Sequence, residues 1–211
     1  MLENKFWTKN EMIKKVISYF PNGSSVNLGI GLPTLVAEMI NEDLNIFIQS
    51  ENGVLGVKGR PKKNEVSPTL INAGKETISI KKGASFFDSA LSFGMIRGGH
   101  IDFSVLGGME VDVEGNLANW MVPGEKITGM GGAMDLVNGA KCVIVVMNHF
   151  TKKGNPKLVK KCTLPLTGVK VVNIIVTELG VFKPVENKFE IVELANKITV
   201  DDLQIEKELI K

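Results

Sequence analysis

Short runs of apolar residues alternate along the chain with segments whose apolar positions recur at helical spacing. Apolar runs of this length, bounded by polar or glycine-rich residues, are typical of strands that are buried on both faces. The runs that we interpret as such strands are residues 25–28, 44–48, 101–106, 141–147 and 169–176. The run at 141–147 is the most apolar, which predicts a position in the middle of a sheet.

The segments between these runs carry helix signals. Helical spacing of apolar residues occurs over residues 8–20, 35–40, 84–96 and 200–210. Thr8 and Glu11 form a Thr-x-x-Glu capping box, which predicts that the first helix begins there, and Thr199 is the expected cap of the last helix. Two further elements are predicted, a hairpin over residues 111–117 and an edge strand over residues 189–194.

The alternation of strands and helices predicts an α/β fold with three layers, in which helices cover both faces of a mostly parallel central sheet. The sequence shows no linker, internal repeat or low-complexity tract. We therefore expect one domain that spans residues 1–211.

Composition and charge exclude several classes of protein. The net charge of +2 on 211 residues is too small and too evenly spread to indicate nucleic-acid binding. No apolar run approaches the ~20 residues that span a bilayer, and the N-terminal residues lack the apolar core of a signal peptide. The two cysteines indicate no disulfide framework, and no cluster of His, Cys and Asp has metal-ligand spacing. We expect a cytoplasmic protein without a catalytic metal and without nucleic-acid or membrane partners.

Glu51 stands where a predicted strand changes into a tight turn. The run Leu44–Ile48 ends at polar residues, and Asn52-Gly53 is a strong turn signal because both residues tolerate positive φ. In open α/β sheets, ligands bind at the edge where strands end. A carboxylate there can act as a base, a nucleophile or a ligand, whereas the ordinary alternative is a solvated turn residue. The local pattern alone favours the solvated residue.

Two glycine-rich segments offer backbone amides at other predicted turns. Gly29 and Gly31 lie between a strand and a helix, in either a tight connection or a turn whose amides face a ligand. The segment Gly129–Leu136 has three glycines within four residues. Consecutive amides in such a turn make a concavity for negative charge, although a segment of this kind standing alone is more often a flexible loop.

The segment Ser50–Gly56, with the sequence SENGVLG, resembles the active-site signature of the family I coenzyme A (CoA) transferases, specifically their B (beta) subunit of the acetate, butyrate and acetoacetate type. Five further segments resemble family segments and occur in family order: residues 26–33, 71–74, 95–100, 117–120 and 129–136. The resemblance extends over most of the chain. It implies the fold shared by CoA-transferases, ribose-5-phosphate isomerase and glucosamine-phosphate isomerase.

The resemblance also implies a covalent mechanism. Glu51 is then the nucleophile, which forms a mixed anhydride and a glutamyl-CoA thioester in a ping-pong cycle. The backbone amides of Gly132 and Ala133 are the implied oxyanion donors. The residues implied to bind substrate or CoA are Gly29, Gly31, Asn52, Gly53 and Gly131. Coenzyme A is a substrate in this scheme, and no permanently bound cofactor is implied.

The alpha subunit of the family, also called A, has its own glycine-rich signature, which does not occur in this sequence. We therefore expect a heteromer with a CoA-transferase alpha subunit, of α2β2 form, that acts on acyl-CoA and short-chain carboxylic acids. The acid pair is left open, because candidate acids differ by a methylene or a polar group, often worth only ~1–3 kcal/mol. Two alternatives also stay open: an acyl-CoA hydrolase that uses Glu51, and a non-catalytic ligand-sensing domain of the isomerase-like fold.

Four other polar residues are interpreted as solvated or structural. Lys58 and Arg60 lie in a basic loop where family relatives often carry a Gly-x-Pro pattern, and such charges are usually solvated. His100 falls within a family segment, but a lone histidine is more often structural than catalytic. Cys162 follows two lysines, which can lower a thiol pKa, yet no histidine lies beside it in the sequence.

Overall fold

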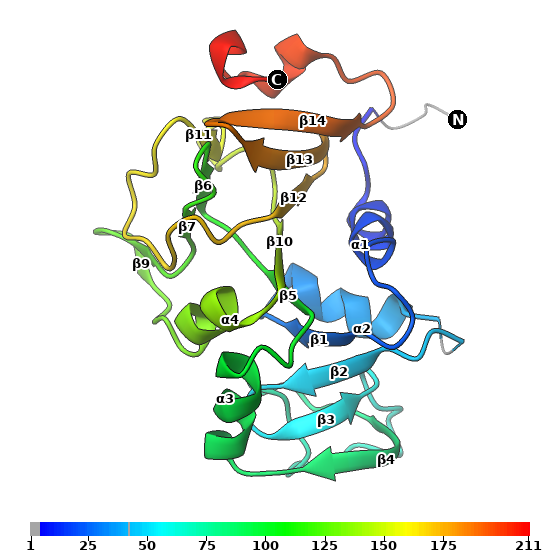
Figure 1. Cartoon of the computed structure of the whole chain (residues 1–211). Coiled ribbons are helices and arrows are strands. Elements are labelled where there is room, and N and C mark those ends of the chain that lie inside the picture. Colours follow the sequence, from blue (N-terminus) through cyan, green and yellow to red (C-terminus); the bar gives the residue numbers. More distant parts are fainter. Residues whose placement is uncertain (1–4, 42) are drawn as a thin grey trace.

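A nine-stranded sheet runs through the middle of the part of the chain that the computed structural model describes, residues 5–41 and 43–211 (Figure 1). In spatial order its strands are β14 (Lys188–Leu194), β13 (Gly180–Val185), β12 (Ile174–Thr177), β10 (Cys142–Val146), β5 (Phe103–Leu106), β1 (Ser25–Leu28), β2 (Phe47–Ser50), β3 (Val54–Val57) and β4 (Ile80–Phe86). The central strands from β12 to β2 are parallel, whereas the strands beyond them pair antiparallel at both edges.

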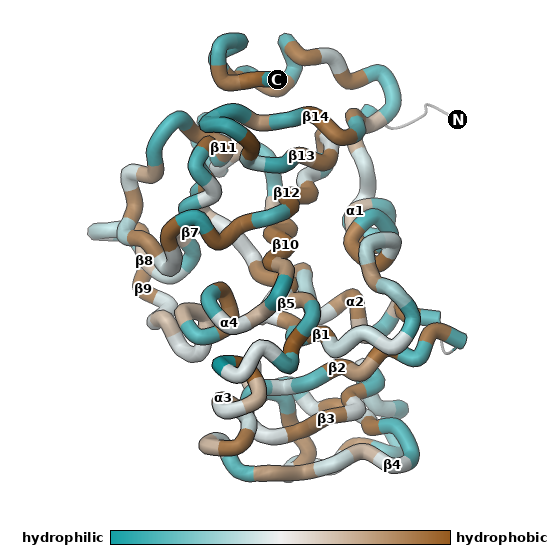
Figure 2. The backbone as a smooth tube through the Cα atoms, viewed as in Figure 1, coloured by the Kyte–Doolittle hydropathy of each residue, from teal (hydrophilic) through white to brown (hydrophobic). Residues whose placement is uncertain are grey.

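The apolar runs form the parallel centre, as predicted. Strand β1 has the expected bounds, and β10 lies between β12 and β5 in the interior of the sheet. The side chains of Val143, Ile144, Val145 and Val146 are at most 1% exposed, because helices and loops cover both faces. Figure 2 shows this concentration of hydrophobic residues along β10. Strand β14 is the edge strand expected near the C-terminus.

Helices cover both faces of the sheet and complete the three predicted layers. Helix α1 (Lys9–Ile17) packs against α2 (Leu35–Met39), β10 and β12 on one face, whereas α3 (Ser89–Arg97) packs against α4 (Ala133–Gly139) on the other (Figure 1). Each face has its own buried apolar cluster. The predicted capping box of α1 is present, since the Thr8 N–H donates to the Glu11 carboxylate (2.7 Å) and the Glu11 N–H to the Thr8 hydroxyl (3.3 Å).

Smaller elements lie around this core. They are the 3-10 helix η1 (Leu32–Thr34), the three-stranded sheet of β11 (Leu158–Val159), β6 (Glu110–Asp112) and β7 (Leu117–Ala118), and the hairpin of β8 (Met121–Val122) and β9 (Lys126–Ile127). The pairing of β6 with β7 confirms the hairpin predicted over residues 111–117.

The helix expected over residues 84–96 was wrong at its start. Residues 80–86 form β4, which pairs antiparallel with β3, so residues 84–86 belong to a strand and not to the helix. Helix α3 begins only at Ser89, where the side chain of Asp88 accepts a hydrogen bond from the Leu91 N–H (2.8 Å). The buried side of α3 includes Ile96 and, unexpectedly, the polar Ser92, whereas Leu91 is 52% exposed.

Two predictions near the C-terminus were also wrong. The expected helix over 200–210 is two 3-10 turns, η2 (Val200–Leu203) and η3 (Lys207–Leu209), separated at Gln204, whose φ of 53° is left-handed. Only the end of the run 169–176 is a strand. Lys170 also has a positive φ, and the N–H groups of Val171 and Val172 both donate to the Gly115 carbonyl, so this part is a loop on the β6–β7 turn.

His149 joins this C-terminal segment to the body of the protein. The ring is completely buried between Phe150 and Phe182, and its Nε2 lies 3.0 Å from the Leu203 carbonyl oxygen. Burial disfavours the charged imidazolium, so the pKa of His149 is lowered from 6.5 to about 4, although the Leu203 carbonyl opposes the shift.

This lowered pKa predicts a pH-dependent stability. Because the unfolded chain binds a proton at His149 more tightly than the folded chain, the free energy of unfolding should fall as the pH decreases from 6.5 to about 4. Between pH 7 and pH 5 this loss is about 2 kcal/mol. Urea unfolding at both pH values measures it. His149→Gln should flatten the pH dependence, and a slope equal to that of the wild-type protein would contradict the prediction.

Candidate active site

Glu51 lies in the turn that connects β2 and β3, and Gly53 fixes the shape of this turn. The Gly53 N–H donates to the Ser50 carbonyl, and the Gly53 carbonyl accepts from the Phe87 N–H, both at 3.0 Å. Gly53 has a φ of 113°, and a Cβ atom there would lie 1.9 Å from the Phe87 carbonyl oxygen. Only glycine fits this position, so the backbone carrying Glu51 is held in one conformation.

The side chain of Glu51 is half-buried between α3 and the start of α4. Its Oε1 lies 2.9 Å from the point where a Cβ on Gly132 would stand, and Cε1 of Phe93 lies 3.0 Å from the same point. The glycine-rich segment and the predicted nucleophile, which are far apart in the sequence, therefore meet in the fold. Phe93 is the third member of this contact, and sequence analysis had not identified it.

The surroundings of Glu51 raise its pKa above the ordinary value. Burial is the main cause, because a partly dehydrated carboxylate loses more by being charged than a solvated one. The backbone of Gly132 favours the charged form and opposes this shift, whereas the nearby charge of Asp135 adds to it. A carboxylate in this environment is a stronger base and a less hydrated nucleophile than one in a solvated turn.

The two backbone amides predicted as oxyanion donors, those of Gly132 and Ala133, have different hydrogen-bond partners in this structure. The Ala133 N–H, at the first residue of α4, donates to the Met130 carbonyl at 3.1 Å. Gly132 approaches the Glu51 carboxylate directly. Gly131 is exposed, with a left-handed φ of 51° that makes the turn into α4.

Helices α3 and α4 are joined next to Glu51. Arg97 on α3 donates from Nε to Asp135 of α4 at 2.7 Å, and its guanidinium lies 6.0 Å from the Phe93 ring centroid. At the far end of α4, a Cβ on Gly139 would stand 2.3 Å from the Ile96 carbonyl oxygen. The two helices thus pack in close contact on both sides of this ion pair, which fixes Gly132 relative to α3.

The remaining predicted binding residues have structural contacts of their own. The amide of Gly29 donates to the Val105 carbonyl at 2.8 Å, so this glycine serves close packing of β1 on β5. Its neighbour Gly31 has a φ of 93° and is exposed. The side chain of Asn52 donates to the Ile71 carbonyl at 2.8 Å, which fastens the Glu51 turn to the next loop.

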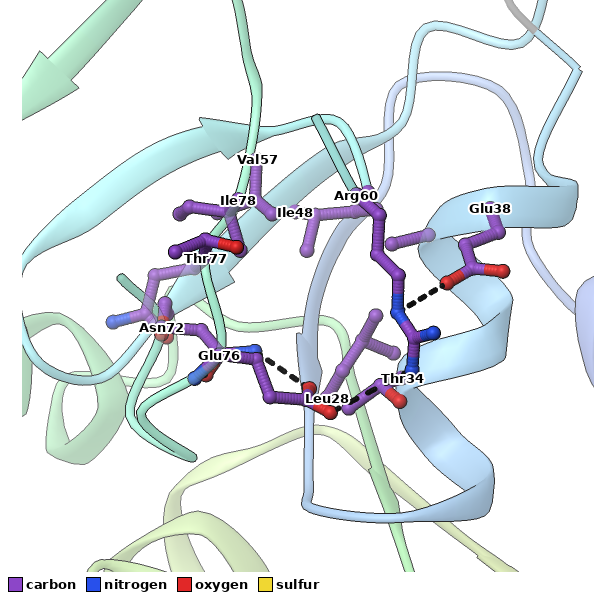
Figure 3. Close-up of a pocket in the computed structure, with 14 residues that line it drawn as sticks. Leu28, Thr34, Glu38, Ile48, Val57, Arg60, Asn72, Glu76, Thr77 and Ile78 are labelled. Carbon is purple, nitrogen blue, oxygen red and sulfur yellow. Dashed lines mark hydrogen bonds and ion pairs between the residues drawn. The ribbon is translucent and has the colours of Figure 1, made fainter. Parts of the chain in front are cut away.

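A pocket opens beside Ser50, between α2, the β2–β3 hairpin and the segment that leads into β4 (Figure 3). Ile48, Val57 and Ile78 give it an apolar wall. Figure 3 shows Arg60 extended across it, with Glu38 at 3.1 Å and Glu76 at 3.8 Å from the guanidinium. Arg60, interpreted from sequence as a solvated charge, is 67% exposed and lies on the rim of this pocket.

The cysteines do not have the surroundings of a nucleophile. Burial and the carboxylates of Asp112 and Glu110 raise the pKa of the Cys162 thiol strongly, in spite of the lysines that precede it in the sequence. Burial also raises the pKa of Cys142. Within residues 5–41 and 43–211 there is no helix long and apolar enough to cross a bilayer, and no group of three or more His, Cys, Asp or Glu side chains arranged to hold a metal ion.

The comparisons of this sequence with known proteins indicate one family. Residues 10–206 match the family described as Coenzyme A transferase. The chain is 51% identical, over 195 residues, to the B-type subunit of a probable succinyl-CoA:3-ketoacid coenzyme A transferase from Bacillus subtilis (strain 168), a match that covers 92% of this chain and 90% of that protein. It is 50% identical, over 200 residues, to the beta subunit of the acetate CoA-transferase from Haemophilus influenzae, covering 95% and 89%.

A solved structure shares the fold. The acyl-CoA transferase apoenzyme of Escherichia coli O157:H7 superposes with a TM-score of 0.75 at 17% sequence identity, over 100% of this chain and 44% of that longer chain. At this identity the likeness concerns the fold alone. The family match extends over most of the sequence, and the names of both sequence relatives place them in the beta class of subunits. The chain therefore belongs to the coenzyme A transferase family, as a member of its B (beta) subunit type.

Proposed function

We propose that this chain is the nucleophile-bearing subunit of an enzyme that moves CoA from a short-chain acyl-CoA to a carboxylic acid of the acetoacetate, butyrate or acetate type. The observation that carries the proposal is the meeting of Glu51, Gly132 and Phe93 at the end of β2. It combines a carboxylate of raised pKa, a backbone amide and an apolar ring at one point. The names of the two sequence relatives support the reaction class.

In the proposed cycle, the Glu51 carboxylate attacks the carbonyl carbon of the acyl-CoA. The C–S bond breaks, leaving a mixed acyl-glutamyl anhydride and CoA thiolate. The thiolate then attacks the glutamyl carbonyl carbon, which releases the first acid as a carboxylate and leaves a glutamyl-CoA thioester. A second acid reverses these two steps and leaves with CoA, so the cycle is covalent and ping-pong.

Each addition in this cycle creates a tetrahedral oxyanion, which needs a hydrogen-bond donor. The amide of Gly132 is the best placed, because it already lies against the Glu51 carboxylate whose carbonyl carbon is attacked in the second step. Ala133 can join it only after its N–H leaves the Met130 carbonyl. Phe93 keeps water from the reacting carbon, and this matters because hydrolysis of the anhydride competes with transfer.

The proposal includes a partner protein. Both sequence relatives are named as one type of subunit within a larger enzyme, and we propose that this chain pairs with an alpha subunit in an α2β2 assembly in the cytoplasm. In this proposal, coenzyme A is a substrate that binds and dissociates, and not a permanently bound cofactor.

The covalent intermediate provides the main test. Incubation of the complex with acetoacetyl-CoA and no acceptor acid should attach CoA to the peptide that contains Glu51, as detected by mass spectrometry. A thioester at Glu51 is chemically equivalent to the substrate thioester, so the adduct should accumulate. Glu51→Ala should fold normally but form no adduct and have no measurable turnover. Steady acid release without an acceptor would indicate a hydrolase, and no reaction would indicate a sensor. An adduct on Cys162 would overturn the glutamate mechanism.

The partner prediction has a separate test. The purified chain alone should catalyse no CoA transfer, and addition of a CoA-transferase alpha subunit should restore it together with a mass consistent with α2β2. Size-exclusion chromatography with light scattering gives the mass, and formation of acetyl-CoA from acetoacetyl-CoA and acetate gives the rate. Full activity of the chain by itself would remove the heteromer from the proposal.

Gly132→Ala tests the proposed oxyanion donor. The new methyl group would stand 2.9 Å from Oε1 of Glu51, so it should displace the amide from the carboxylate. We expect kcat to fall by ~10²–10³ with little change in KM, the effect of losing one such donor. Gly94→Ala is the matched control, because a Cβ there meets no atom within 4 Å on the exposed side of α3. A change confined to KM would instead assign Gly132 to ground-state binding.

A further inference from the structure

A row of buried polar side chains crosses the middle of the sheet below α3. Asn27 on β1 lies level with Gln49 on β2 and with Ser104 on β5. All three are at most 1% exposed, although most of this sheet interior is built from apolar side chains. Ser92 of α3, which is also completely buried, lies above the row.

Gln49 stands at the centre of this polar group. Its Oε1 accepts a hydrogen bond from the Asn27 side-chain amide, and its Nε2 donates to the Ser92 hydroxyl at 2.8 Å. The row is not built for stability, because Oδ1 of Asn27 and Oγ of Ser104 have no hydrogen-bond partner among the described residues. Buried polar atoms without partners are costly, and apolar side chains of the same size would pack here at lower cost.

The position of the row relates it to the candidate active site. Gln49 and Glu51 are two residues apart, so their side chains project towards the same face at the end of β2. Ser92 directly precedes Phe93, whose ring and the Glu51 carboxylate both lie within 3.0 Å of the point where a Cβ on Gly132 would stand. A hydrogen bond between Gln49 and Ser92 therefore joins the strand of the nucleophile to the helix that contacts it.

The same helix also holds Gly132. Arg97 of α3 is paired with Asp135 of α4, and Gly139 of α4 packs directly on the backbone of Ile96. Displacement of α3 on β2 would consequently move both Phe93 and the segment that begins at Gly132. The Gln49–Ser92 bond is the buried polar contact by which α3 is seated on β2.

We propose that Gln49 and Ser92 are positioning residues that set Phe93 and Gly132 against the Glu51 carboxylate. The proposal deepens the proposed function and rests on it for its catalytic consequence. Its structural part concerns only the environment of Glu51. Without the link, α3 moves away from β2, water reaches the carboxylate, and the amide of Gly132 is displaced from it. The other charged groups beside Glu51 are Asp135 and its partner Arg97, and the variants used below replace neither of them.

The first measurement needs no catalytic activity. Carbon-13 NMR of the full chain, labelled at glutamate carboxyls and assigned with Glu51→Ala, follows the titration of Glu51 directly. Ser92→Ala and Gln49→Met should each move the titration midpoint of Glu51 down, towards the value of a solvated carboxylate. Ser92→Cys keeps a weak acceptor and should recover part of this change. Thr177→Val is the control: it removes another completely buried hydroxyl, at the far side of the sheet, and should lower the melting temperature without moving the midpoint.

The second measurement uses the complex with the alpha subunit. Ser92→Ala should lower kcat ~10-fold or more with KM nearly unchanged, because a misplaced catalytic group slows chemistry more than binding. The double variant Gln49→Met with Ser92→Ala should lose no more than Gln49→Met alone, as expected for two residues that act through one contact.

The possible outcomes separate the two proposals. If Ser92→Ala and Gln49→Met lower the melting temperature but leave the Glu51 midpoint where it is in the wild type, the two residues are structural and the inference is overturned. Additive losses of kcat in the double variant would overturn it as well. If the midpoint moves as expected while the wild-type complex transfers no CoA, the positioning role stands and the proposed function fails.

Discussion

The close approach of Gly53 to Phe87 is the contact on which the candidate site depends. It fixes the turn that carries Glu51, and the hydrogen bond from the Phe87 N–H to the Gly53 carbonyl fixes the chain two residues before α3 begins. The cap at Asp88 then starts α3 in a defined direction, and α3 in turn carries Phe93 to the carboxylate and holds α4 through Asp135. A side chain at Gly53 would break this sequence of contacts at its first step, because no rearrangement short of moving the Phe87 backbone makes room for it.

The environment of Glu51 shows a compromise between stability and chemistry. A carboxylate whose pKa is raised by burial destabilises the folded protein at neutral pH relative to a solvated one. The polar row of Asn27, Gln49 and Ser104 below α3 adds a second cost. Both lie within one small region, whereas the sheet around them is packed with apolar side chains. Such concentration of unfavourable groups is typical of sites where function, and not folding, determines the residues.

The sequence predicted correctly those elements that are stabilised by residues close to one another along the chain. The capping box at Thr8, the apolar run of β10 and the turn at Asn52-Gly53 each act through neighbouring residues, and each occurs as expected. Residues 84–86 were mistaken for the start of a helix because their pairing with β3 is a tertiary contact. The left-handed residues Lys170 and Gln204 give no sequence signal of the kind that glycine gives. Phe93 was missed because its position near Glu51 is also a tertiary contact, which depends on how α3 packs on the sheet.

The order of the strands has a consequence for how the chain folds. The hairpin of β2 and β3 that carries Glu51 joins residues that are close in the sequence. Strand β1, in contrast, pairs on one side with β5, where Val26 lies opposite Phe103, far along the chain. Contacts of such long sequence separation are slow to form because of the chain entropy lost on closing the loop. Glu51 is therefore in its turn early, and Gly132 reaches it only when the parallel centre has assembled. During synthesis on the ribosome, Glu51 and its hairpin are made before the residues of α3 and α4 that surround the carboxylate in the folded chain.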